Sequence, residues 1–178
     1  MLRYLLLALL LYGWLGCTPA STPATPLSPF FDLTAFFEAE TARLATLGPV
    51  TKRTIINGVA ESKTVSGLDY RAELAPFISA DINRPAWLDK YRVDSLTRDG
   101  QLQKLTYTAL DDDLFTRRVV IAFDNATVDS IYIEKASSLM IADTRRTLVY
   151  QPASGYSIRG AQQVLLASDN SIGIEVAF

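Results

Sequence analysis

Hydrophobic residues recur at helical spacing in the segment that begins near residue 30, and polar residues lie between them. The stripe consists of Phe30, Leu33, Phe36, Phe37, Leu44 and Leu47. Ser28 or Asp32 can cap the first turn, and Gly48-Pro49 ends the pattern. The spacing predicts an amphipathic helix. Its aromatic stripe could face a partner, but such stripes more often pack into the protein's own core.

A second helical stripe follows Asp69, whose carboxylate can cap the helix. Its apolar positions are Tyr70, Leu74, Phe77 and Ile78. We expect Pro76 to distort this helix, because proline lacks a donor N–H and crowds the preceding turn. Residues 81–87 then form a loop, or a short helix opened by Pro85, with Trp87 and Tyr91 packed on the core.

Residues 50–56 and 59–65 flank Asn57-Gly58, the dipeptide that most readily enters the tight turn of a hairpin. Pairing Ile56 with Val59 sets Lys52 opposite Lys63, so neither face of this ribbon is consistently apolar. The pattern predicts a partly exposed hairpin with apolar residues at its tip. That tip could be a contact site, but an edge ribbon of a sheet explains it as well.

From Arg92 onward the hydrophobic period changes to two, and acidic or amide residues mark turns at hairpin spacing. Apolar residues alternate with polar ones at Leu105, Tyr107 and Ala109, at Val119, Ile121 and Phe123, and at Ile172, Ile174, Val176 and Phe178. One face of the resulting sheet is apolar and must be shielded from water, and the two helices can pack against it. The sequence therefore predicts an α+β fold, a twisted antiparallel meander with two N-terminal amphipathic helices on one face.

The chain opens with Arg3 and an apolar run from Tyr4 to Leu15, which is typical of a secretory signal. This run is shorter than the roughly 20 residues that a membrane-spanning helix needs. It ends in Leu15-Gly16-Cys17, which resembles the cleavage motif of the bacterial lipoproteins cut by signal peptidase II. The resemblance implies that the Cys17 thiol is acylated, whereas an unmodified Cys17 would pack as a small hydrophobic residue.

The composition changes after Cys17. Four prolines are interleaved with Ser, Thr and Ala before residue 30, namely Pro19, Pro23, Pro26 and Pro29. Such a stretch favours an extended stalk of about 3 Å per residue. We therefore divide the chain into a signal peptide (1–16), a lipidated Cys with its stalk (17–29) and a single α+β domain (30–178). In the lipoproteins that it resembles, Asp after the Cys favours the inner membrane. Thr18 stands there, so the resemblance implies the outer membrane, with the domain facing the periplasm.

Composition excludes several classes of site. The chain has no His and one Cys, so sites that depend on His, internal disulfides and thiolate zinc cages are impossible. The 17 basic and 19 acidic residues give a net charge of −2, which provides no footprint for nucleic acid. We predict no cofactor, no metal and no catalytic residue.

The remaining polar clusters each have a plainer explanation. Asp111-Asp112-Asp113 could offer oxygen ligands to Ca²⁺ but lacks the spacing of a calcium loop, and consecutive Asp residues suit a turn. Ser62-Lys63 could form a catalytic dyad only if the Lys were buried. Two arginine pairs place one cation on each face of a strand, where it can bind an anion or an internal carboxylate. These pairs are Arg117-Arg118 and Arg145-Arg146.

The whole chain resembles short cell-envelope lipoproteins of Bacteroidota. Our first hypothesis is a non-enzymatic lipid-anchored envelope protein that binds an unknown protein partner or supports envelope assembly. A second is a carrier of an apolar ligand, a lipid or acyl chain, held between sheet and helices by residues such as Phe37, Phe77, Tyr107 and Phe123. A third is a carboxylate-dependent hydrolase, which needs two acids facing a cleft.

Overall fold

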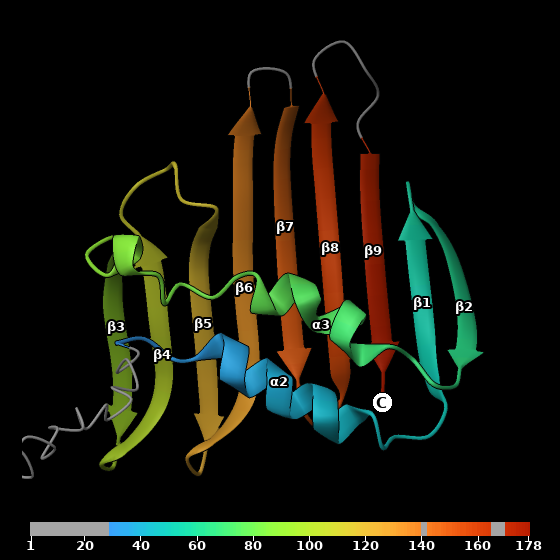
Figure 1. The fold of residues 1–178 in the computed structure, drawn as a ribbon, viewed down its shortest axis with the longest axis horizontal. Helices are drawn as coiled ribbons and strands as arrows, with labels where there is room; N and C mark the ends of the chain where they lie inside the picture. Colours follow the sequence, from blue (N-terminus) through green and yellow to red (C-terminus); the bar gives the residue numbers. More distant parts are fainter. Residues whose placement is uncertain (1–28, 140–141, 165–169) are drawn as a thin grey trace, which may run out of the picture.

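The computed structural model describes residues 29–139, 142–164 and 170–178. Within them, nine antiparallel strands form one open sheet, and both α-helices lie across the same face (Figure 1). The helices are α2 (Leu33–Leu44), α3 (Tyr70–Ile78) and the 3-10 helix η1 (Pro85–Trp87). The strands are β1 (Val50–Ile56), β2 (Val59–Val65), β3 (Tyr91–Arg98), β4 (Gln101–Ala109), β5 (Thr116–Asp124), β6 (Thr127–Leu139), β7 (Ala142–Gln151), β8 (Gly155–Val164) and β9 (Asn170–Ala177). The predicted α+β class is confirmed, while the signal peptide, Cys17 and the stalk up to residue 28 lie outside the described residues.

The sheet is a meander that an N-terminal hairpin extends. The strand order is β2-β1-β9-β8-β7-β6-β5-β4-β3, so consecutive strands are neighbours from β3 to β9. Strand β1 pairs antiparallel with β9, placing Thr54 opposite Ile174. The hairpin is therefore the edge ribbon that the sequence favours. Ser62 and Lys63 lie exposed on its outer strand β2, which argues against a dyad with a buried Lys.

The hairpin turn has the geometry that its sequence predicts. Asn57 and Gly58 both have positive φ, +47° and +84°, as the preferred two-residue turn requires. The register pairs Ile56 with Val59. These two side chains project from the tip, with 57% and 76% of their surface exposed.

The two α-helices, α2 and α3, each begin at an Asp cap. The Asp32 carboxylate accepts a hydrogen bond from Ala35 N at 2.8 Å, and the Asp69 carboxylate accepts one from Ala72 N at 3.2 Å. Such caps contribute about 1 kcal/mol each. Pro76 does not end α3, which continues through it to Ile78.

The core lies between the helices and the central strands. Alternate residues of β5 to β8 point toward the helices and are fully or almost fully buried, among them Ile121, Ile131, Ile133, Leu148, Tyr150 and Tyr156. The helices contribute Leu33, Phe37, Leu44, Leu74 and Phe77. Burial of one such side chain contributes about 1.5–3 kcal/mol. The two helices therefore cover the apolar face of the sheet, as predicted.

The segment after α3 attaches the start of the domain to the sheet. Asp81 accepts hydrogen bonds from the backbone N and the hydroxyl of Thr34, both at 2.9 Å. The Tyr91 hydroxyl donates to the carbonyl of Thr116 at 2.7 Å. Trp87 packs against the core from η1, so the predicted anchoring by Trp87 and Tyr91 is confirmed.

Candidate functional site

The three consecutive aspartates lie on the exposed connection between β4 and β5. Asp111 pairs with Lys90 at 3.0 Å, and Asp112 pairs with Arg117 at 3.1 Å. Across residues 29–139, 142–164 and 170–178, no group of three potential metal ligands comes together. The structure therefore supports the interpretation of Asp111, Asp112 and Asp113 as turn residues with local ion pairs.

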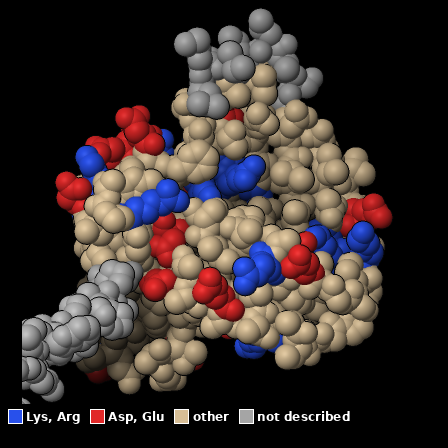
Figure 2. Space-filling view, in the orientation of Figure 1, with Lys and Arg blue, Asp and Glu red and all other residues tan. Residues whose placement is uncertain are grey.

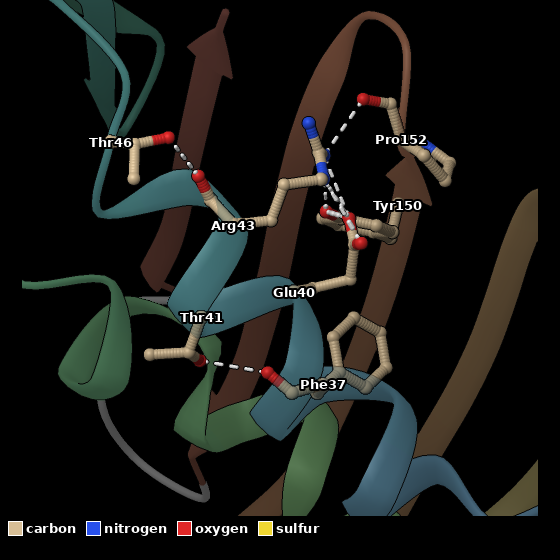
Figure 3. A network of polar contacts seen from close by, with 7 residues as sticks. All are labelled: Phe37, Glu40, Thr41, Arg43, Thr46, Tyr150 and Pro152. Atoms are coloured by element: carbon tan, nitrogen blue, oxygen red, sulfur yellow. Dashed lines mark hydrogen bonds and ion pairs between the residues drawn. The ribbon is translucent and has the colours of Figure 1, made fainter.

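A polar network joins α2 to the sheet (Figure 3). The Tyr150 hydroxyl on β7 donates to the Glu40 carboxylate, and Arg43 binds the same carboxylate through Nε and Nη2 at 2.7–3.1 Å. Arg43 Nη2 also donates to the carbonyl of Pro152 at 3.0 Å. Burial, together with the hydrogen bond to Glu40, raises the pKa of Tyr150. The phenol therefore stays protonated and attaches the helix to the sheet.

A second network of the same kind joins α3 to the sheet. Glu73 accepts hydrogen bonds from the Tyr156 hydroxyl at 2.6 Å and from Lys52 Nζ at 2.5 Å. Burial and this carboxylate raise the pKa of Tyr156. Both oxygens of Glu73 are thus occupied by internal donors. The hydrolase hypothesis needs a carboxylate that is free to exchange a proton with a substrate, and Glu73 does not offer one.

The contacts of Phe37, Phe77, Tyr107 and Phe123 bear on the carrier hypothesis. Phe37 and Phe77 are fully buried, with ring centroids 4.9 Å apart. The Tyr107 hydroxyl accepts from Phe31 N at 3.0 Å, and the Phe123 and Phe31 rings are 6.3 Å apart. The protein's own side chains therefore fill the space at these residues. A bound apolar molecule between sheet and helices stays a prediction, but the side chains expected to line its cavity contact other residues of the protein instead.

Beside α3, the same face carries a cluster of cations that we call the basic cluster, consisting of Lys135, Arg146 and Arg84. Lys135 on β6 lies directly opposite Arg146 on β7, and Arg84 precedes η1. Only 7% of the Lys135 surface is exposed. Figure 2 shows Lys and Arg side chains together in the upper middle of this face. Burial and the charges of Arg146 and Arg84 lower the pKa of Lys135.

An apolar hollow of about 280 Å³ adjoins the basic cluster at Arg146. Its floor includes Gly160, which lies opposite Arg146, and Ile172, which lies opposite Gly160. Ile56 from the hairpin tip forms another part of its wall. Half or more of the surface of each isoleucine is exposed, 57% for Ile56 and 50% for Ile172. One cation of the basic cluster, Arg146, thus lies beside two exposed apolar side chains.

The face of the sheet opposite the helices has no described element packed over it. Two adjoining hollows lie there, about 510 and 560 Å³ in volume, and Arg117 and Arg145 line both. Arg118 and Glu134 line the smaller one. Arg117 is held by Asp112, so one member of its pair makes the internal ion pair that the sequence allowed. We call this surface the uncovered face.

Sequence reasoning singled out Arg146 but missed Lys135. A signal was present, because Ile131, Ile133 and Lys135 occupy alternate positions of one strand, so the lysine shares the buried side. A Lys at the end of an apolar alternation can also snorkel to solvent, and the pattern alone does not separate the two outcomes. Only the placement of α3 and Phe115 over this position decides the burial of Lys135.

Comparison with protein families, with curated proteins and with solved structures finds no match to this chain. Within the described residues, no helix has the length and apolar character needed to cross a bilayer.

Proposed function

We propose that this chain is a non-enzymatic, lipid-anchored protein of the cell envelope whose domain binds an envelope protein partner. The observation that carries the proposal is Leu15-Gly16-Cys17 directly after an apolar signal segment. A Pro-rich stretch then leads to Phe30, the first buried residue of the domain. This order, an acylated Cys, an extended stalk and a folded domain, suits a protein tethered at a membrane surface.

The anchor is tested by growing cells that express the full chain with an alkyne analogue of palmitate. We expect the label on the wild-type protein and none on Cys17→Ala. On a density gradient the wild type should sediment with the outer membrane, and Thr18→Asp should shift to the inner membrane. An unlabelled wild type would refute the anchor, whereas a labelled protein in the inner membrane would refute only the sorting.

The uncovered face is the surface that we assign to the protein partner. It spans the sheet from β3 to β2, and its central side chains are polar or half-buried, such as Thr106, Tyr132 and Ser157. The Tyr132 hydroxyl donates to Glu134 at 2.6 Å, which fixes an aromatic ring and a carboxylate on this surface. Aromatic and arginine side chains are the types enriched at protein interfaces.

Site-specific photocrosslinking in cells tests this assignment. A photoreactive phenylalanine at position 118 faces the partner, and the same residue at position 38 lies exposed on α2 as the matched control. We expect a discrete adduct at 118 and none at 38. Adducts at 38 alone would place the partner on the helices and refute the assignment to the uncovered face.

A further inference from the structure

Lys135 is a buried cation that faces other cations. Its ammonium group donates a hydrogen bond to Ser79 Oγ at 2.9 Å, and the Phe115 ring lies 5.4 Å from it. The Ser79 hydroxyl itself donates to the carbonyl of Pro76 at 2.8 Å, so it acts as the acceptor toward Lys135. An ammonium group has three donors. The described residues thus satisfy one of them, and the neighbour across the strand pair is Arg146.

The described residues supply no carboxylate to this group. No Asp or Glu oxygen among them lies within 4.0 Å of the nitrogens of Lys135, Arg146 or Arg84. Lys52, another lysine on the helix-covered face, is instead matched by Glu73 at 2.5 Å. Like charges directly opposite each other destabilise a sheet, and a buried charge without a partner is costly. The basic cluster is therefore set up to receive an anion.

The hollow beside Arg146 indicates that the bound anion carries an apolar group. A Cβ at Gly160 would lie 3.5 Å from Arg146 Cγ and 3.4 Å from Ile172 Cγ2. A methyl group at Gly160 would therefore touch both side chains, so the glycine lets the Arg146 stem lie across β8 beside Ile172, and the exposed Ile56 continues this surface. At about 280 Å³ the hollow is slightly smaller than the usual range of small-molecule sites, about 300–1,000 Å³. Besides Ile56 and Ile172, polar residues also line it, namely Asn57, Thr144, Gln162, Asn170 and Ser171.

We propose that Lys135, Arg146 and Arg84 bind the phosphate head group of a single-chain amphiphile, whose apolar part lies against Ile172 and Ile56 beside the stem of Arg146. A phosphate monoester carries up to two negative charges and three strong acceptor oxygens. It therefore matches an ammonium and two guanidinium groups better than a carboxylate does. Arg84 stacks on Trp87, 4.4 Å from the ring centroid, and its charge acts on Lys135. This inference does not rest on the anchor at Cys17.

The test is calorimetric titration of the full chain, as the cell makes it, in phosphatidylcholine nanodiscs. The probe is decyl phosphate below its micelle concentration, with empty nanodiscs as the blank. We expect one saturable site per chain, and affinity lower by about tenfold or more in Lys135→Met and in Arg146→Gln. Arg71→Gln, on the exposed side of α3, should bind as the wild type does.

Two further ligands test the cationic part and the apolar part of the site separately. Inorganic phosphate and decanol should each bind far more weakly than decyl phosphate. Equal affinity for inorganic phosphate would refute the apolar half, and equal affinity for decanol would refute the role of the cations. Absence of saturable binding of decyl phosphate would refute the whole proposal.

Thermal unfolding without ligand shows whether Lys135 has only a structural role. Because Lys135 lacks an anionic partner in the described protein, Lys135→Met should raise Tm while it weakens binding. A variant that loses both stability and binding would indicate that the lysine serves the fold through Ser79 and Phe115, and it would overturn the assignment.

Discussion

The start of β8 lies so close to the end of β9 that only glycine fits there. Gly155 begins β8 with φ of +141°, opposite Ala177 at the end of β9. A Cβ at Gly155 would lie 1.9 Å from the carbonyl oxygen of Val176 and 3.0 Å from its carbonyl carbon. Both atoms belong to the backbone, so no side-chain rotation can relieve the overlap. Gly155→Ala therefore forces β8 and β9 apart at the point where Val176 is buried.

The magnitude follows from two costs. A non-glycine residue held at an unfavourable positive φ costs about 1–3 kcal/mol. Separating the strand ends removes about two ladder hydrogen bonds, each contributing about 1 kcal/mol. We therefore expect Gly155→Ala to lower the free energy of unfolding by about 3–5 kcal/mol. For a domain of this size that corresponds to a fall in Tm of about 6–20 °C.

Urea unfolding followed by circular dichroism measures this change. The matched control is Gly48→Ala, because a Cβ at Gly48 meets no atom within 4 Å. We expect that variant to lie within about 0.5 kcal/mol of the wild type, or to be slightly more stable. If Gly155→Ala lies within about 1 kcal/mol of the wild type, the close approach of β8 and β9 at Gly155 is refuted.

Three further predictions concern the buried side chains. Burial raises the pKa of Tyr150 and Tyr156, so the folded state keeps protons that the unfolded state releases above about pH 10. The free energy of unfolding should then fall by about 1.4 kcal/mol per pH unit for each tyrosine. Urea unfolding and tyrosinate absorbance measure this fall. A flat profile up to about pH 12 would contradict this. Glu73→Gln should lower the free energy of unfolding by about 1–3 kcal/mol in urea titrations, because it weakens the acceptor shared by Tyr156 and Lys52. The exposed control Glu38→Gln should change the free energy of unfolding by less than about 0.5 kcal/mol. Phe77→Ala should cost about 3–5 kcal/mol by the same assay, and a smaller loss would mean that the core collapses into the cavity.

Local features of the fold could be predicted from the sequence because short segments determine them. Asn57-Gly58 has one favoured turn, and that turn fixes the register of the hairpin on either side. Asp32 and Asp69 each precede a helical stripe, and both act as caps. Strand alternation likewise indicated which residues of β5 face the helices. In each case one local preference agrees with the burial that the whole fold requires.

The pairing of β1 with β9 could not be predicted in the same way. The two strands are far apart in sequence, and their register depends on where the sheet ends and on the path of the chain from α2. The sequence of β1 alternates Lys52, Thr54 and Ile56 on the inner side, a pattern that fits several neighbours equally well. Its pairing with β9 depends on contacts distant in sequence, which the local pattern of β1 does not contain.

The basic cluster shows why a site is harder to predict than a fold. Lys52 and Lys135 both point to the helix-covered face, and in sequence each is a lysine in a strand. Their difference arises from α3, which brings Glu73 to Lys52 but brings the hydroxyl of Ser79 to Lys135. The helix thus neutralises one lysine and buries the other beside Arg146. A buried lysine beside an arginine lowers the stability of the fold unless an anion binds to it. A bound anion would offset this cost, and this is the physical basis for assigning a ligand to Lys135.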